Sequence, residues 1–148
     1  MTTSISAMHK GARGYLGVGK MMKGLPGKHN YRNVFLGAKE TPVSIERPKP
    51  GLVAIGIRGL RGADGLLCPA WGTPEPGRGM VTERDIEHPT NRWFEQIRVA
   101  GGFQLRYHLK PSLYLGISED GHPTLSETPV VWQEPADFAT TSMHLWSF

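Results

Sequence analysis

The sequence has a single cysteine, Cys68, so no internal disulfide can hold the fold together. It has no apolar run approaching the roughly 18 residues of a membrane span, and its first residues show no signal-peptide core. It also has no Asn-x-Ser/Thr glycosylation sequon. These absences predict a cytoplasmic protein that has no signal peptide and no membrane partner.

Recognisable catalytic and cofactor motifs are absent as well. The six histidines show no His-Glu-x-x-His or Cys/His spacing, so we expect no metal site. No Gly-x-Ser-x-Gly elbow occurs, and residues 17–20 do not complete a phosphate-binding loop. The sequence therefore predicts a protein that is not an enzyme and holds no cofactor.

Glycine and proline, in contrast, are plentiful along the whole chain. The 148 residues include 19 Gly and 12 Pro, together about a fifth, where roughly 12% is usual. Such frequent breaks disfavour long helices and favour short strands joined by turns. With 39% hydrophobic and 20% charged residues, the chain is expected to be globular rather than disordered. Its length fits a single domain, residues 1–148.

One sequence pattern occurs twice. Residues 9–18 and 108–117 both read His-x5-Tyr-Leu-Gly-[Val/Ile], and the two copies lie 99 residues apart. A degenerate copy, residues 60–68, lies about midway between them. Because successive copies of the pattern lie about 50 residues apart, the sequence predicts three related units. Their approximate bounds are 1–50, 51–100 and 101–148.

Alternating apolar and polar residues predict the strands of these units. The strand-like segments are residues 43–47, 51–57, 94–99, 101–107 and 145–148. A helix over residues 90–99 is the competing interpretation, since Asn91 is a suitable cap and Trp93 and Ile97 have helical spacing. Consistency with the other two units favours a strand there.

The most informative segment is residues 19–33, a long basic stretch without an acidic residue. It exceeds what a hairpin needs, and long loops in compact domains are usually functional. An exposed lysine on such a loop fits the acidic specificity pocket of a trypsin-like serine protease. We therefore predict a protease-binding loop with Lys23 or Lys28 in the pocket. The loop comprises Lys20, Lys23, Gly24, Leu25, Pro26, Gly27, Lys28, His29 and Asn30. An alternative loop contains Arg61 and Gly62.

Two other functions stay open. The first is a carbohydrate-binding lectin without Gln-x-Trp motifs, in which exposed tryptophan faces stack on glycans. Four tryptophans are available, Trp71, Trp93, Trp132 and Trp146, of which Trp93 and Trp146 are interpreted as core. The second is weak binding to an anionic polymer, because residues 1–61 hold 11 Lys/Arg against 2 Asp/Glu, whereas residues 62–148 hold 6 against 11. Attraction between the two parts of the chain explains the same asymmetry.

The three units, each a run of short strands, resemble a β-trefoil. This resemblance implies an all-β fold in which three four-stranded repeats form a six-stranded barrel capped by hairpins. With the basic loops and the two Tyr-Leu-Gly copies, the chain is similar to the mushroom (fungal) trefoil serine protease inhibitors. In that family inhibition is assigned to loops that differ between members, so the residues named above come from loop chemistry and not from the resemblance.

Overall fold

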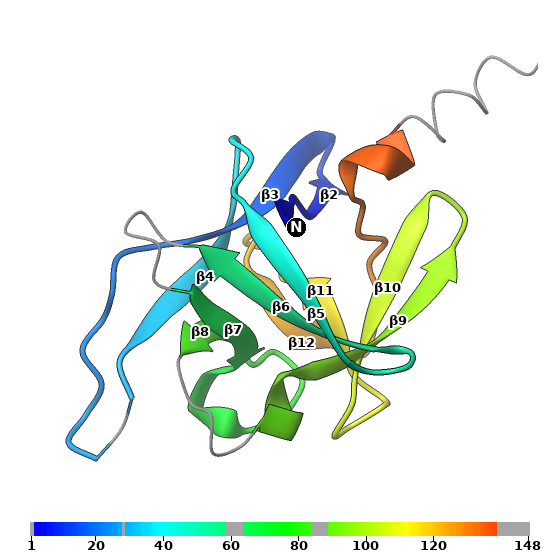
Figure 1. Ribbon diagram of the computed structural model, residues 1–148. Coiled ribbons are helices and arrows are strands. Elements are labelled where there is room, and N and C mark those ends of the chain that lie inside the picture. Colours follow the sequence, from blue (N-terminus) through cyan, green and yellow to red (C-terminus); the bar gives the residue numbers. More distant parts are fainter. Residues whose placement is uncertain (1, 28, 59–63, 84–88, 139–148) are drawn as a thin grey trace, which may run out of the picture.

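Figure 1 shows the computed structural model, which describes residues 2–27, 29–58, 64–83 and 89–138. These residues form twelve strands, two short 3₁₀ helices and one helical turn at residues 135–138, so the prediction of an all-β protein is confirmed. The strands are β1 (Thr2–Thr3), β2 (Ser6–His9), β3 (Ala12–Val18), β4 (Tyr31–Gly37), β5 (Val43–Lys49), β6 (Leu52–Arg58), β7 (Asp64–Pro69), β8 (Met80–Glu83), β9 (Trp93–Val99), β10 (Gly102–Tyr107), β11 (Tyr114–Ile117) and β12 (Pro123–Ser126). The 3₁₀ helices are η1 (Ala70–Gly72) and η2 (Pro89–Arg92).

The strands form one antiparallel sheet rather than three equivalent units. Its hydrogen-bonded order is β12-β11-β10-β9-β6-β7-β8-β4-β3-β2, with β5 added at β6 and β1 added at β5. Within the described residues the end strands β2 and β12 do not pair, so the sheet is not closed into a barrel. The predicted β-trefoil, with its six-stranded barrel and hairpin cap, is therefore wrong. The Tyr-Leu-Gly pattern specifies a strand and its buried side, but it does not specify which strand pairs with it.

The local strand predictions at 43–47, 51–57, 94–99 and 101–107 are confirmed by β5, β6, β9 and β10. The competing helix over 90–99 is wrong, because η2 ends at Arg92 and β9 is paired along both edges. Phe94 lies opposite Tyr107 of β10 on one side and opposite Val53 of β6 on the other. The strand predicted at 145–148 lies outside the described residues.

The two Tyr-Leu-Gly segments have the same burial pattern in β3 and β11. In both, the leucine and the glycine are buried and their neighbours are half-buried. Glycine is needed at the third position because a partner side chain lies close to it. A Cβ atom on Gly17 would lie 3.2 Å from the Phe35 ring, and one on Gly116 would lie 2.7 Å from Ser126 Cβ. The glycine of the Tyr-Leu-Gly pattern therefore reflects close packing between neighbouring strands.

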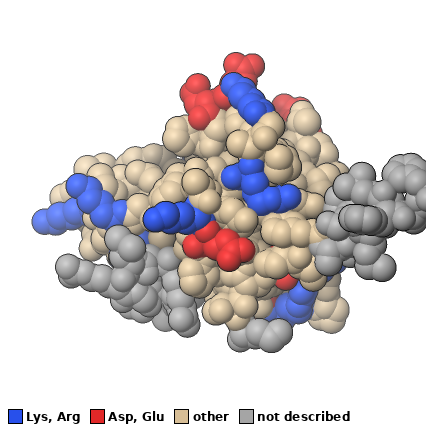
Figure 2. Space-filling view, turned by 90° about the horizontal axis from the view of Figure 1, so that it is seen from above, with Lys and Arg blue, Asp and Glu red and all other residues tan. Residues whose placement is uncertain are grey.

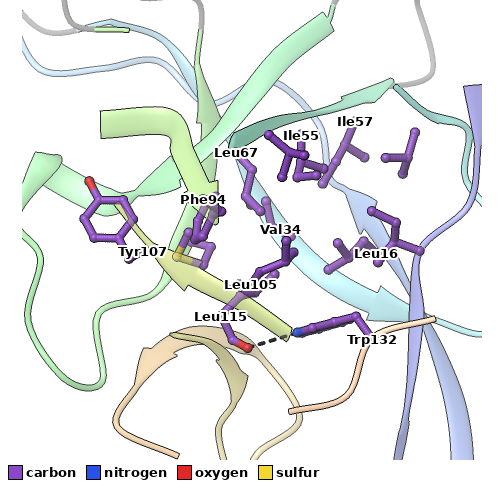
Figure 3. Packing of buried hydrophobic residues seen from close by; sticks show 14 of the residues in the cluster. Leu16, Val34, Ile55, Ile57, Leu67, Phe94, Leu105, Tyr107, Leu115 and Trp132 are labelled. Atoms are coloured by element: carbon purple, nitrogen blue, oxygen red, sulfur yellow. Dashed lines mark hydrogen bonds between the residues drawn. The ribbon is translucent and has the colours of Figure 1, made fainter. Parts of the chain in front are cut away.

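Buried apolar side chains from most of the strands meet in one core (Figure 3). Trp132, which follows β12, is fully buried in it. The backbones of Trp132 and Phe103 exchange two hydrogen bonds, at 2.9 and 2.7 Å. The indole Nε1 donates to the Leu115 carbonyl oxygen at 2.9 Å. The segment after β12 is thereby fixed to β10 and β11.

A buried polar cluster adjoins this core at Arg92, whose side chain is fully buried. Its Nη1 donates to Asn91 Oδ1 at 2.6 Å, and its Nη2 lies 3.4 Å from Glu83 Oε1. The Tyr107 hydroxyl donates to the Asn91 carbonyl oxygen at 2.9 Å. Burial raises the pKa of Tyr107 to about 12; the nearby Cys68 acts in the same direction and Arg92 opposes it. The folded chain therefore favours the neutral phenol.

This cluster predicts how stability depends on alkaline pH. The ordinary tyrosine pKa is about 10, so the stability that Tyr107 contributes is fully present below that pH. It is lost as pH rises through the folded pKa of about 12. Tyr107→Phe removes the titrating group and the hydrogen bond. The variant should melt lower at neutral pH, but its melting temperature should fall less steeply across this alkaline interval. Thermal unfolding at stepped pH values checks this, and equal slopes for both proteins would contradict it.

Candidate functional site

The loop that joins β3 to β4, residues 19–30, projects from the sheet (lower left in Figure 1). We call it the basic loop. It contains Lys20, Lys23, Gly24, Leu25, Pro26, Gly27, His29 and Asn30 of the predicted site. Lys28, Arg61 and Gly62 lie outside the described residues. The described residues of the predicted primary site therefore all lie in one loop, and the structure shows which hydrogen bonds fix that loop.

The base of the basic loop is fastened to β4 by backbone and side-chain hydrogen bonds. The Gly19 N–H donates to the Asn33 carbonyl oxygen at 3.0 Å. Arg32 is buried, with 7% of its surface exposed, and its Nη1 donates to the Gly19 carbonyl oxygen at 2.8 Å. A buried guanidinium needs such acceptors because burial removes its hydration. Arg32 therefore acts as an internal brace for the loop.

Two further connections brace the outer part of the loop. Met22 and Tyr31 exchange backbone hydrogen bonds at 2.6 and 3.0 Å. Beyond them, the Gly24 N–H donates to Asn30 Oδ1 at 3.1 Å. The Lys23–Gly24 peptide bond therefore lies between two cross-links to the returning chain. The turn at the tip uses Gly27, whose φ of 80° lies in the left-handed region that glycine adopts readily.

Side chains alternate along residues 21–25 as in an extended strand. Met21, Lys23 and Leu25 are exposed, whereas Met22 and Gly24 are partly buried. The exposed fractions of Met21 and Leu25 are 44% and 61%. In an antiparallel pair, the residues flanking a hydrogen-bonded pair direct their N–H and C=O groups to the opposite side. Those groups of Met21 and Lys23 therefore face away from Tyr31, and the described residues offer them no partner.

Sequence reasoning found the lysines of this loop but missed its braces. Arg32 shares the buried face of β4 with Val34, so its position in register with an apolar residue is the signal that could have identified it. No local signal pointed to the Met22–Tyr31 pair. Asn30 was named as part of the loop, but its side-chain bond to Gly24 depends on the path of the chain.

The tryptophans differ in their surroundings. Trp132 is core, whereas Trp71 is 64% exposed. Trp93, predicted to be core, is only half-buried; its ring lies 5.6 Å from the His108 ring and 5.5 Å from Lys49 Nζ. Trp146 lies outside the described residues. His108 is exposed in the loop after β10, where its ring contacts that of Trp93.

Charge is mixed on the face shown in Figure 2, where Asp and Glu side chains (red) lie among Lys and Arg side chains (blue). Lys10 also donates to the Glu119 carbonyl oxygen at 3.0 Å, which joins the basic N-terminal part to the acidic C-terminal part. Nucleic-acid binding typically needs a continuous basic surface. Binding to an anionic polymer therefore stays a prediction from composition.

Two searches of the described residues concern other classes of function. No group of three or more His, Cys, Asp or Glu side chains in the described part of the chain is placed to hold a metal ion. None of the helices among residues 2–27, 29–58, 64–83 and 89–138 has the length and apolar character needed to cross a membrane.

Comparison with known proteins gives a fold relationship. No protein-family model matches the sequence, and no curated protein matches it. The structure is similar to that of a salivary protein from Culex quiquefasciatus of the Cysteine and Tryptophan-Rich (CWRC) family. The TM-score is 0.64 at 12% sequence identity, over 90% of this chain and 93% of that chain. This chain has one cysteine, so it does not share the cysteine richness in that name.

This finding corrects two expectations. The resemblance to fungal trefoil inhibitors is wrong, because neither the topology nor the comparisons support it. The comparison also points away from the expected cytoplasmic localisation, since the structural neighbour is a salivary protein. At this identity the similarity concerns the fold alone, and the chain shares an all-β architecture with that salivary protein.

Proposed function

We propose that this protein binds and inhibits a trypsin-like serine protease through the basic loop, with Lys23 in the specificity pocket. The observation that carries the proposal is the position of the Lys23–Gly24 peptide bond between two cross-links, Met22–Tyr31 and Gly24–Asn30. A protease that binds at this peptide bond would contact a loop whose conformation the two cross-links already fix.

Charge supports Lys23 as the anchor. The specificity pocket of a trypsin-like protease contains a buried carboxylate. Lys23 is exposed, and residues 19–33 include no acidic side chain that would compete for its ammonium group. Hot-spot residues of interfaces are side chains that fill a desolvated pocket on the partner. Lys23 has the length and charge for this pocket.

The backbone supports a substrate-like mode of docking. Exposure alternates along residues 21–25, and the Met22–Tyr31 pair leaves the N–H and C=O groups of Met21 and Lys23 on the side away from β4. An exposed strand edge of this kind pairs with an extended segment of a partner. Met21 and Leu25 flank Lys23 on the same side, so they add apolar contact area on either side of the pocket. Pro26 limits the conformational freedom lost on docking.

The cross-links explain why docking would lead to inhibition rather than to release of cut products. When the protease serine attacks the Lys23 carbonyl carbon, the Gly24 nitrogen accepts a proton and leaves as an amine. That amine stays beside the acyl group, because Asn30 holds Gly24 while Tyr31 holds Met22. Re-formation of the peptide bond is then an intramolecular step with a high effective concentration. Net hydrolysis is slow for this reason.

The proposal is tested by titrating trypsin with the protein and following hydrolysis of a small chromogenic substrate. We expect activity to fall in proportion to added protein, and the chain to be recovered largely intact. Unchanged trypsin activity, or rapid and complete cleavage after Lys23, would reject it.

Replacing Asn30 by alanine should make the basic loop a better substrate of trypsin and the protein a weaker inhibitor. The variant loses the bond that holds the Gly24 nitrogen, so the amine escapes more often after acylation. We expect trypsin to cleave Asn30→Ala at Lys23–Gly24 up to about tenfold faster than the wild type, since one hydrogen bond contributes up to about 1.4 kcal/mol. Mass spectrometry of timed samples measures this.

Asn33→Ala is the matched control. Asn33 is exposed on β4, and its backbone carbonyl, which the variant keeps, makes the bond to Gly19. We expect its cleavage rate to equal that of the wild type. Equal rates for the wild type and both variants would show that the Gly24–Asn30 bond does not protect the loop.

A further inference from the structure

The connection between β7 and β8 presents an exposed tryptophan in a strained conformation. Trp71 has 64% of its surface exposed, the highest fraction among the exposed large hydrophobic residues described. Its backbone lies at φ 63° and ψ 9°, in the left-handed region. A bulky non-glycine residue rarely adopts this region, because its Cβ is crowded there. Trp71 therefore costs the fold stability without burying its side chain.

Backbone hydrogen bonds fix the residues on either side of Trp71. The Ala70 N–H donates to the Gly79 carbonyl oxygen at 2.9 Å, which closes the base of the connection. Gly77 and Arg78 exchange hydrogen bonds with the backbone of Leu125 in β12, at 2.8 and 2.9 Å. The connection is thereby clamped at its base and along β12. Strain that is held by its surroundings and confined to one exposed side chain is typical of functional positions.

Packing does not account for the tryptophan. The next residue, Gly72, has the same φ of 63°, and glycine at position 71 would satisfy the backbone without strain. With 64% of Trp71 exposed, most of its surface is in solvent, and it is not part of the buried core formed by the described residues. The remaining role for the indole is contact with another molecule.

The side chains on the same connection as Trp71 indicate the chemical class of that molecule. No other large hydrophobic side chain is exposed among the described residues of this connection, whereas a protein-binding surface normally has a wider apolar centre. Polar groups lie on the same short connection. They are the Thr73 hydroxyl and the ion pair of Glu75 with Arg78, whose side chains are 52% and 24% exposed. The pair neutralises itself, so the site carries little net charge.

We propose that Trp71 and the polar groups of the β7–β8 connection form a binding site for a neutral, pyranose-containing glycan. The C–H face of a pyranose ring stacks on an exposed indole, as apolar surfaces do on aromatic rings. The sugar hydroxyls then exchange hydrogen bonds with Thr73, Glu75 and Arg78. The site is separate in sequence from the basic loop, so it does not depend on protease inhibition.

The first experiment screens the full chain on an array of neutral oligosaccharides that end in galactose, glucose, mannose or N-acetylglucosamine, beside sulfated and sialylated glycans. We expect binding to one class of neutral glycan. Absence of binding to every neutral glycan, or binding to charged glycans alone, would overturn the proposal.

The second experiment compares the wild type with Trp71→Gly and Trp71→Tyr, using the best neutral oligosaccharide from the array in isothermal titration. We expect Trp71→Gly to bind at least tenfold more weakly and to melt at a higher temperature, because the strain is relieved. Trp71→Tyr keeps an aromatic face and should retain part of the affinity. Equal affinity for the wild type and Trp71→Gly would contradict the proposed site.

Discussion

Lys23→Ala is expected to weaken inhibition of trypsin by about thirtyfold or more. Truncating a residue that fills a desolvated pocket typically costs at least about 2 kcal/mol, which is roughly that factor in the inhibition constant. The loss is large because the protease carboxylate stays buried without its cationic partner. Inhibition constants measured from steady-state rates of a chromogenic substrate give the factor. Lys23→Arg keeps a cation of suitable length and should remain an inhibitor.

Lys20→Ala is the control that separates pocket binding from general attraction. Lys20 is an exposed lysine of the same loop, so its removal changes the net charge by the same amount. If only the overall positive charge matters, both alanine variants weaken inhibition equally, and added salt weakens it further. We expect a change of less than about threefold for Lys20→Ala, since exposed charges contribute little. Equal effects of the two variants would exclude Lys23 as the anchor.

Trp132→Ala is expected to destabilise the folded chain by about 3–5 kcal/mol, the usual range for removing a large buried aromatic side chain. Trp132 is fully buried, and its indole N–H is bonded to the Leu115 carbonyl oxygen. The variant therefore leaves both a cavity and a buried acceptor without its donor. This loss is a large share of the roughly 5–15 kcal/mol that keeps a typical domain folded. Urea unfolding followed by circular dichroism measures it.

Trp71→Gly provides the matched comparison for that measurement. Both variants remove an indole, but the one at position 71 is mostly in solvent and sits on a strained backbone. We expect the midpoint of urea unfolding to fall sharply for Trp132→Ala and to rise slightly for Trp71→Gly. Equal midpoints would mean that the two tryptophans do not differ in burial as described.

The candidate site was predictable in part. A basic segment longer than its hairpin requires is visible in the sequence, and the structure places most of its residues in one projecting loop. The features that make the loop an inhibitor candidate were not visible. Arg32, Tyr31 and Asn30 brace the loop through contacts that form only when β4 returns alongside residues 19–24. Such contacts depend on the chain path, and residue type alone does not specify the path.

The sequence by itself determined the all-β character and most local strands of this protein. Frequent glycine and proline disfavour long helices, and alternation over 101–107 gives that strand one more deeply buried side, because side chains of a strand alternate between its two faces. Residues 51–57 were also predicted as a strand, but residues 53–57 are buried on both faces. The Tyr-Leu-Gly pattern marks a strand as well, but the reason for its glycine is visible only in the structure, where Gly17 and Gly116 each lie against a side chain of the neighbouring strand.

Only the tertiary structure decided how these strands pair. Backbone hydrogen bonds are the same whichever residues carry them, so the pattern that suggests three equal units is equally compatible with an open sheet. Here β6 pairs with β5, β7 and β9, and the order that follows is not closed. The same holds for the tryptophans. Trp132 and Trp71 are chemically identical, and only the packing around them makes one a core residue and leaves the other exposed on a strained turn, because burial depends on neighbours distant in sequence.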